Sequence, residues 1–207
     1  MEIIIDGTPG YPFGELPATL IGVLKGLEEG TRTGGRGITR IEVDGKEILP
    51  EDVMDKMGDH AVDTVGSVAI TTRSLNEMVR DCLSRMRETV RELPGLCRSL
   101  AEVFQSDTPE EGFEPFQRLA EIWHIIKQNE MHVASTIGLD LENTPVEGKA
   151  LRESHMELNT YLGECIGALE AGDTVLIGDL LEYELAPRAE SEAHILATLE
   201  QHAGLSA

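Results

Sequence analysis

Residues 65–90 of the chain read VGSVAITTRSLNEMVRDCLSRMRETV, and the period of the apolar residues changes near Arg73. Before that point, apolar residues come in short runs that glycine pairs and turn residues interrupt. After it, Leu75, Met78 and Cys82 begin a pattern of three- and four-residue spacings that continues in several long stretches. Short runs are typical of strands, and the longer period is typical of amphipathic helices. The sequence therefore predicts an α+β protein in which a sheet precedes the helices.

The first 73 residues have the signals of a small mixed α/β unit, a short open sheet with one packed helix. Strand patterns cover residues 2–6, 38–49 and 65–72. Helical spacing covers residues 17–29 and, more briefly, 50–57. Asp44-Gly45 is typical of the two-residue turn of a β-hairpin. We therefore assign residues 1–73 to an N-terminal domain.

Residues 74–207 have the pattern of a mainly antiparallel acidic helical bundle. Two helical seams of apolar residues are especially long, and each contains one polar residue. The first consists of Phe116, Leu119, Trp123, Ile126, Glu130, Val133 and Ile137. The second consists of Leu151, His155, Leu158, Leu162, Cys165 and Leu169. Pro94 and Pro187 interrupt other helical stretches. We expect Pro94 to break its helix, with a short helix following to about Gln105, and Pro187 to bend or divide its helix.

The formal net charge of the chain is −21 at pH 7. Residues 1–73 carry 13 acids and 7 bases, and residues 74–207 carry 25 acids and 10 bases. Nucleic-acid phosphates and anionic lipids repel such a protein, so we expect neither nucleic acid nor membrane as a partner. The charge either serves solubility alone or attracts another protein with a basic surface.

Bases are concentrated in the first predicted helix of the bundle. They are Arg80, Arg85, Arg87, Arg91 and Arg98. Beyond Arg152, Arg188 is the only base, against eleven acids. The opposite charges of these two parts of the bundle predict that its first helix packs beside its last two.

Cysteine usage and hydropathy indicate a cytoplasmic protein. Cys82, Cys97 and Cys165 fall in helical segments, and none belongs to a CxxC pair. An odd number of such thiols is typical of reduced, partly buried cysteines inside a cell. The N-terminal residues lack the pattern of a signal peptide, and no apolar run approaches the ~20 residues that a membrane span needs.

Two polar residues, Glu130 and His155, occupy seam positions where the pattern requires apolar ones. If the two seams face each other, these side chains can pair, which would either set the helix register or provide half of a metal site. Di-iron bundles use Glu-x-x-His on two helices and a carboxylate on each of two others. This chain has Glu121-x-x-His124 once, with Glu184 as a further carboxylate. The metal interpretation therefore uses Glu121, His124, Glu130, His155 and Glu184, and otherwise no cofactor is predicted.

Three other segments contain candidate binding residues. Residues 30–37, GTRTGGRG, form either a mobile connection or an anion-binding loop through Arg32 and Arg36, although the P-loop ending is missing. Tyr11 and Phe13, in a turn-rich loop, either cover the N-terminal core or contact a partner. In residues 178–185, GDLLEYEL, a helix would place two further partner-contact candidates, Leu181 and Tyr183, on different sides.

No complete catalytic motif is present, which favours a protein that is not an enzyme. We expect a cytoplasmic protein–protein interaction module, such as an adaptor, a chaperone-like factor or an assembly subunit, that presents an acidic helical surface. Self-association is compatible with the number of apolar seams. The alternative is a metal-binding helical bundle with a redox, storage or sensing role.

Overall fold

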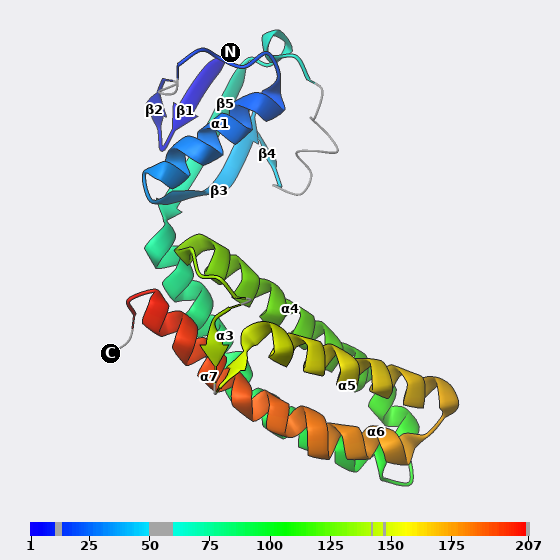
Figure 1. The fold of residues 1–207 in the computed structure, drawn as a ribbon. Helices are drawn as coiled ribbons and strands as arrows, with labels where there is room; N and C mark the ends of the chain where they lie inside the picture. Colours follow the sequence, from blue (N-terminus) through cyan, green and yellow to red (C-terminus); the bar gives the residue numbers. More distant parts are fainter. Residues whose placement is uncertain (11–13, 50–59, 142, 147, 206–207) are drawn as a thin grey trace. The chain divides into compact units, whose positions relative to one another are not determined.

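The computed structural model describes residues 1–10, 14–49, 60–141, 143–146 and 148–205. The chain divides into two compact units, Met1–Met78 and Val79–Ala207, which we call the sheet unit and the helical unit (Figure 1). The sequence pattern predicts a boundary after Arg73. Strand β5 ends at Ser74 and helix α3 begins at Leu75, so the change of apolar period marks the passage from strand to helix. The expected α+β architecture is confirmed.

The sheet unit contains a five-stranded mixed sheet with the strand order β2-β1-β5-β3-β4. Its strands are β1 (Glu2–Ile5), β2 (Thr8–Pro9), β3 (Arg36–Val43), β4 (Lys46–Ile48) and β5 (Ser67–Ser74). Strands β1 and β5 are parallel, and the other neighbouring pairs are antiparallel. Together with one helix on one face, this order is a β-grasp topology, and a topology alone assigns no function.

The predicted hairpin joins β3 to β4. Val43 pairs with Lys46, and the two turn residues Asp44 and Gly45 have φ values of 51° and 75°. Two consecutive positive φ values are typical of the type I′ turn that an Asp-Gly pair favours. The Asp44 carboxylate also accepts a hydrogen bond from the backbone N–H of Ser67 at 2.8 Å, which ties the turn to β5.

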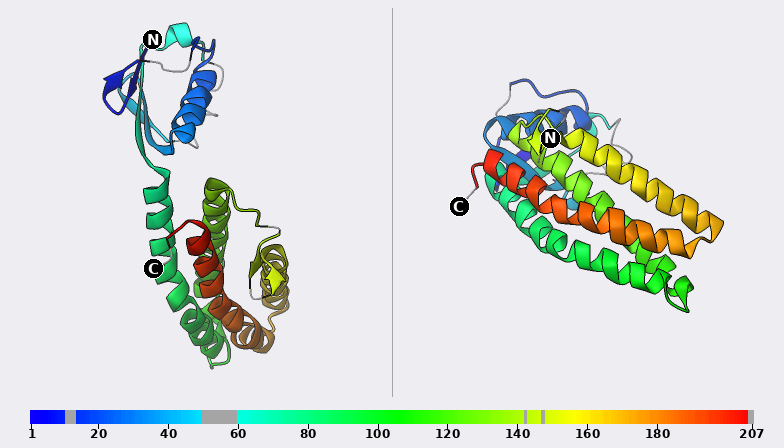
Figure 2. Two further views of the ribbon diagram at one scale, coloured as in Figure 1. Left: turned by 60° about the vertical axis from the view of Figure 1, so that its left-hand side comes forward. Right: turned by 60° about the horizontal axis from the view of Figure 1, so that its bottom comes forward.

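Helix α1 (Leu20–Thr33) packs on one face of the sheet (Figures 1 and 2). The Thr19 side chain caps the helix by accepting a hydrogen bond from the Gly22 N–H at 3.3 Å. Buried apolar residues of the helix and the strands form the core of this unit. They include Leu20, Val23, Leu24, Leu27, Ile3, Ile41, Val43, Val68 and Ile70. A short 3₁₀ helix, η1 (Val62–Thr64), precedes β5, and the helix predicted at residues 50–57 lies outside the described residues.

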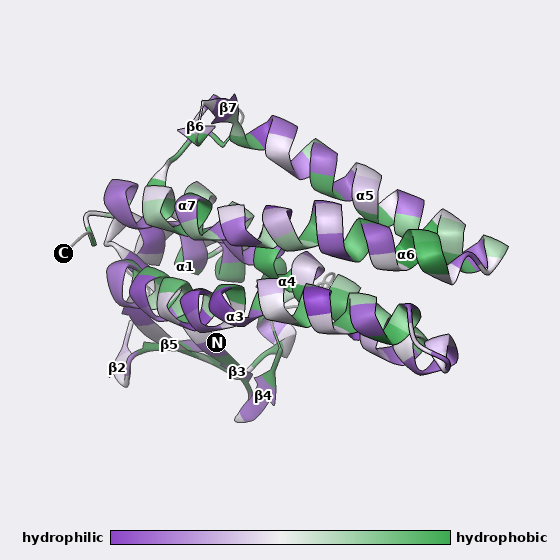
Figure 3. Cartoon of the chain, turned by 90° about the horizontal axis from the view of Figure 1, so that it is seen from below, coloured by the Kyte–Doolittle hydropathy of each residue, from purple (hydrophilic) through white to green (hydrophobic). Residues whose placement is uncertain are grey.

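The helical unit is built mainly of long helices. They are α3 (Leu75–Phe104), α4 (Phe113–Ile137), α5 (Leu151–Ala171), α6 (Thr174–Leu180) and α7 (Ala186–His202). Shorter elements join them: the 3₁₀ helix η2 (Pro109–Gly112), the strands β6 (Pro145–Val146) and β7 (Lys149–Ala150), and the π-helical segment η3 (Leu181–Leu185). Hydrophobic and hydrophilic residues are interspersed along each helix, as expected for amphipathic helices (Figure 3).

The prediction that Pro94 breaks its helix is wrong. Helix α3 continues through Pro94 to Phe104. Leu93 and Cys97, on either side of the proline, are fully buried and continue the apolar face of the helix. Their packing outweighs the roughly 3 kcal/mol that an internal proline costs.

Pro187 neither ends its helix nor leaves it regular. Helix α6, η3 and α7 follow one another without an intervening turn from Thr174 to His202. The π-helical segment ends at Leu185, two residues before the proline, and it contains Tyr183, whose carbonyl group the proline ring would clash with in a regular helix. A π turn widens the backbone at this point, which explains how the helical path continues.

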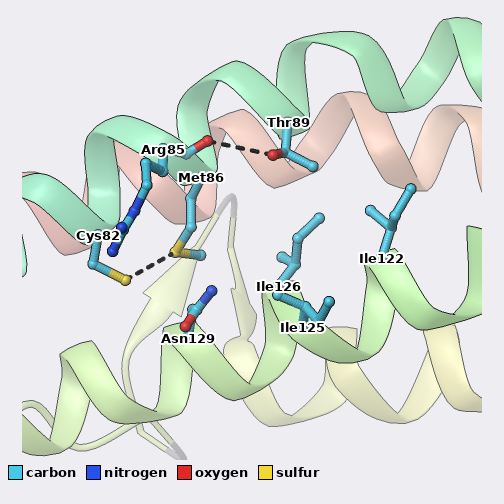
Figure 4. Close-up of a pocket in the computed structure, with 8 residues that line it drawn as sticks. All are labelled: Cys82, Arg85, Met86, Thr89, Ile122, Ile125, Ile126 and Asn129. Carbon is cyan, nitrogen blue, oxygen red and sulfur yellow. Dashed lines mark hydrogen bonds between the residues drawn. The ribbon is translucent and has the colours of Figure 1, made fainter.

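The directions of three helices follow from their contacts. Arg87 pairs with Glu200 and Arg98 with Glu190, so α3 and α7 are antiparallel. These pairs join the basic helix to the acid-rich residues that follow Arg152, as the charge pattern predicts. Helix α3 is also antiparallel to α4, because Cys82 lies nearer Asn129 and Thr89 nearer Ile122 in a groove between them (Figure 4). Helices α4 and α7 therefore run in the same direction.

Candidate functional site

The two polar seam residues meet inside the helical unit. Glu130 on α4 is fully buried, and the Nε2 atom of His155 on α5 lies 2.9 Å from Glu130 Oε2. The predicted pairing of these two side chains is therefore confirmed. Both were visible in the sequence because each interrupts an otherwise apolar helical seam.

Three further charged residues complete this site, and the sequence reasoning missed them. Glu192 on α7 is fully buried and accepts hydrogen bonds from Lys127 Nζ at 2.7 Å and from Arg188 Nη1 at 2.6 Å. Lys127 also donates to Glu130 at 3.1 Å, so its ammonium group bridges the two carboxylates. We call Lys127, Glu130, His155, Arg188 and Glu192 the ion cluster.

One sequence signal could have revealed Glu192. Leu185, Glu192 and Leu199 are spaced seven residues apart, and all three are fully buried. A seven-residue spacing keeps positions on one helix face, so Glu192 occupies a seam position just as Glu130 does. The interruption at Pro187 had obscured this third seam.

Burial changes the protonation of the ion cluster. Desolvation, together with the nearby charge of Glu130, raises the pKa of Glu192 to about 7, and the cations of Lys127 and Arg188 oppose this shift. Desolvation and the Lys127 charge lower the pKa of His155 to about 4. His155 is therefore neutral at pH 7, and we assign the proton to Nε2, because Glu130 can then accept a hydrogen bond from it.

The arrangement can hold three helices in register and can bind a proton. Two cations face two carboxyl groups on α4 and α7, and the neutral imidazole of α5 joins them. Burying such groups is costly, so a cluster of this kind adds specificity of packing more readily than net stability.

Of the five residues of the metal interpretation, the structure brings Glu130 and His155 together but not Glu121, His124 and Glu184. Glu121 and His124 are exposed and line a surface hollow of α4 with Gln117 and Ile125, and Glu184 hydrogen-bonds Tyr161. Within the described part of the chain, no three His, Cys, Asp or Glu side chains form a group that could hold a metal ion. Lys127 already supplies the positive charge between the buried carboxylates.

The other candidate residues have separate environments. Arg36 begins β3 and binds Asp6 at 3.3 Å and Thr72 at 2.6 Å, and Arg32 lies in the last turn of α1. The connection predicted over residues 30–37 is therefore shorter, because α1 extends to Thr33. Burial raises the pKa values of the Cys97 and Cys165 thiols to about 12, which leaves them unreactive.

Of the four residues considered for partner binding, one is open to a partner in the described structure. Tyr183 is 64% exposed, whereas Leu181 is fully buried in the core of the helical unit. Both lie in the π-helical segment, two residues apart and on different sides, as the sequence pattern predicts. Tyr11 and Phe13 lie outside the described residues.

Tyr183 belongs to an end of the helical unit that is unusually acidic. Residues 101–118 and 164–184 carry eleven acids and one base, Arg118, and we call these two segments the acidic end. They lie close together, because Gln105 Nε2 is 3.4 Å from Asp179 Oδ1. Several large apolar side chains are exposed there: Phe113, Ile166, Val175, Leu176 and Tyr183.

A second surface feature is an apolar groove between α3 and α4 with a volume of about 320 Å³ (Figure 4). Met86, Ile122 and Ile126 line it, Ile125 is exposed beside it, and Cys82, Arg85 and Asn129 lie toward one end. Burial raises the pKa of the Cys82 thiol, so this cysteine is not an activated nucleophile.

These features define an acidic helical-bundle protein with an N-terminal β-grasp unit and charged residues in its core. The family described as "Domain of unknown function (DUF8042)" matches residues 81–192, more than half of the chain, and the chain belongs to this family. The matched segment contains the whole ion cluster and the acidic end. No helix of the described residues has the length and apolar composition to cross a membrane.

The chain is also similar to an "Uncharacterized protein" of Treponema pallidum (strain Nichols). The two are 26% identical over 192 residues, which cover 90% of this chain and 92% of that relative. The similarity therefore extends over both units. No solved structure matches the chain.

Proposed function

We propose that the protein is a non-enzymatic interaction module that binds a basic, amphipathic segment of another protein through its acidic end. The observation that carries the proposal is the exposure of Tyr183, Val175 and Ile166 among eleven acids and one base. Exposed aromatic and aliphatic side chains provide the buried contacts of an interface. Carboxylates around them attract and orient a basic partner.

The turn between α5 and α6 gives this surface its shape. Gly172, with φ 70°, ends α5, and the Asp173 carboxylate caps α6 by accepting a hydrogen bond from the Leu176 N–H at 3.0 Å. The first turn of α6 therefore carries Val175 and Leu176, which are 62% and 43% exposed. A short, capped helix start is a rigid platform, so partner binding there requires little ordering of the chain.

The experiment uses two fluorescent peptides of identical Leu and Lys content. One has helical amphipathic spacing, and the other has a scrambled order. We expect the full-length protein to bind the amphipathic peptide more tightly than the scrambled one, with affinity that falls but persists as salt rises. Replacement of Val175 and Tyr183 by serine is expected to weaken binding by roughly thirtyfold or more, since truncation of an interface anchor costs about 1 kcal/mol or more.

Met156→Ser is the matched control. Met156 is 60% exposed on α5, outside both segments of the acidic end. Its replacement removes an exposed apolar side chain outside the acidic end and is expected to leave the affinity unchanged. Equal affinity for both peptides, or unchanged affinity in the Val175 and Tyr183 double variant, would reject the proposal.

A further inference from the structure

The core of the helical unit contains N–H groups that no protein acceptor satisfies. Among the described residues, Trp123 Nε1 and the Nε and Nη2 atoms of Arg188 are buried without a hydrogen-bond partner. Trp123 is 1% exposed and the Arg188 side chain 7%. Each unsatisfied buried donor costs about 1–3 kcal/mol, so the structure gains if an acceptor binds there.

Helix geometry places these donors in one layer. Lys127 on α4 contacts Glu192 on α7 at 2.7 Å, and the two helices run in the same direction. Trp123 and Arg188 each lie four residues, about one helical turn, before these contacting residues. The step from one contact to the next is therefore the same on both helices. Lys127 Nζ lies 5.7 Å from the Trp123 ring centroid, and Lys127 and Arg188 both contact Glu192 Oε1, so we infer that Trp123 lies beside Arg188.

The unpaired side-chain atoms that the structure describes in this layer are N–H donors. A water molecule would accept from them, but its own two hydrogens would need further acceptors. A halide ion only accepts. We propose that the Trp123–Arg188 layer binds one small inorganic anion, such as chloride, inside the helical unit.

The charge of the surroundings supports this assignment. Arg188 Nη1 is occupied by Glu192 and Ser191, so the other two nitrogens of the guanidinium group, Nε and Nη2, remain for a second acceptor. Lys127 and Arg188 balance the charges of Glu130 and Glu192. Because the pKa of Glu192 is raised to about 7, the cluster gains a net positive charge as this carboxyl group takes up a proton. An anion in the adjacent layer compensates that charge.

Bromide is the probe, because it replaces chloride and scatters X-rays anomalously. In crystals grown with sodium bromide, we expect an anomalous peak within hydrogen-bonding distance of Arg188. In solution, we expect bromide to raise the melting temperature of the full-length protein more than gluconate does at equal ionic strength, with saturation as for a bound ligand.

Two variants test the donors. Arg188→Lys keeps the positive charge beside Glu192 but removes Nε and Nη2, and we expect bromide to bind about tenfold more weakly or worse. Trp123→Phe keeps most of the ring and removes Nε1, so it is expected to weaken binding less. Arg98→Lys, at an exposed pair with Glu190, is the control and is expected to keep the full bromide effect.

Three results would overturn the proposal. These are a water molecule or no peak at Arg188 in the bromide crystals, equal stabilisation by bromide and gluconate, and an undiminished bromide effect in both donor variants. If Arg188→Lys does not fold, the anomalous map and the Trp123→Phe variant still show whether an anion binds at this layer.

Discussion

The cores of the two units are built on different principles. In the sheet unit, the buried polar side chains that the structure describes are Thr31 and Thr72. Their hydroxyl groups donate to the Leu27 carbonyl group at 2.8 Å and to the Asp6 carboxylate at 2.7 Å. The helical unit instead buries Glu130, Arg188 and Glu192 among apolar side chains, with Lys127 between the two carboxylates.

The difference concerns how each core specifies its packing. Apolar contacts are non-directional, and many arrangements of a Leu-rich bundle bury similar area. Strand pairing already fixes the register in a sheet, whereas helices can slide or rotate against one another. We infer that the ion cluster supplies the missing register of α4, α5 and α7, because a shift by one turn would leave buried carboxylates unpaired.

The largest effect is expected from Lys127→Met. This change removes the cation between Glu130 and Glu192 and leaves two buried carboxyl groups close together. Breaking a buried ion pair costs about 3–5 kcal/mol, so we expect a loss of that size in the free energy of unfolding. Trp123, the only tryptophan, lies in the helical unit with Lys127 Nζ 5.7 Å from its ring centroid, and its fluorescence reports the transition.

Two controls test whether the loss in Lys127→Met comes from unpaired buried charges rather than from the loss of a lysine side chain. Lys149→Met removes an exposed pair with Glu157 and is expected to cost far less than Lys127→Met, because solvent screens an exposed ion pair. Replacing Lys127, Glu130, Arg188 and Glu192 together by Met or Leu is expected to be neutral or stabilising. A small loss in Lys127→Met, comparable to that of the Lys149 control, would contradict the role given to the cluster.

The corresponding change in the sheet unit is Leu27→Ala. Leu27 is fully buried on α1, and deletion of its side chain creates a cavity whose expected cost is about 3 kcal/mol. Because the apolar cores of the two units are separate clusters, we expect faster amide exchange in β5 with no change in the Trp123 transition. A shift of both signals would show that the units unfold together.

The pH dependence of stability distinguishes the units further. Glu192 has a folded pKa of about 7, so its contribution is fully present below pH 4.5 and is lost as pH rises through 7. His155 has a folded pKa of about 4, so its contribution is present above pH 6.5 and is lost as pH falls through 4. Between pH 4.5 and 6.5 the two contributions oppose each other.

His155→Gln is therefore expected to expose the contribution of Glu192. The free energy of unfolding of the wild-type helical unit should change little between pH 4.5 and 6.5. In the variant it should fall by about 2–3 kcal/mol as pH rises across this window. Denaturant unfolding, followed by Trp123 fluorescence at several pH values, measures the free energy of unfolding of both proteins. Parallel pH profiles of the two proteins would contradict the neutral, buried state of His155.

The sequence predicted the features that depend on local pattern. The Asp44-Gly45 turn, the change of period at Arg73 and the Glu130–His155 contact all follow from spacing along the chain. Lys127 and Arg188 could not be found in this way, because a charged residue on an amphipathic helix is normally a solvent-exposed one. Their place beside the buried carboxylates depends on which helices become neighbours, and the interruption at Pro187 obscured the third seam.

The smallest effect is expected at the polar contact between Asp6, which directly follows β1, and Thr72 of β5. Asp6 accepts hydrogen bonds from the Thr72 N–H and hydroxyl groups, each at 2.7 Å, and these bonds hold its pKa below the usual range. Asp6→Asn keeps the side-chain shape and tolerates the φ of 50°, but an amide has only one oxygen to accept both bonds. Because Asp6 is largely exposed, we expect a loss below about 1 kcal/mol.

This loss should also depend on pH in the direction opposite to that of Glu192. A lowered carboxyl pKa stabilises the fold above the unfolded value, and the contribution is lost as pH falls through the folded pKa. The rates of amide exchange of β5 in wild type and Asp6→Asn should therefore differ at pH 6 and converge at the lowest accessible pH. A cost as large as that of Lys127→Met would mean that the sheet unit, too, depends on a charged residue for its register.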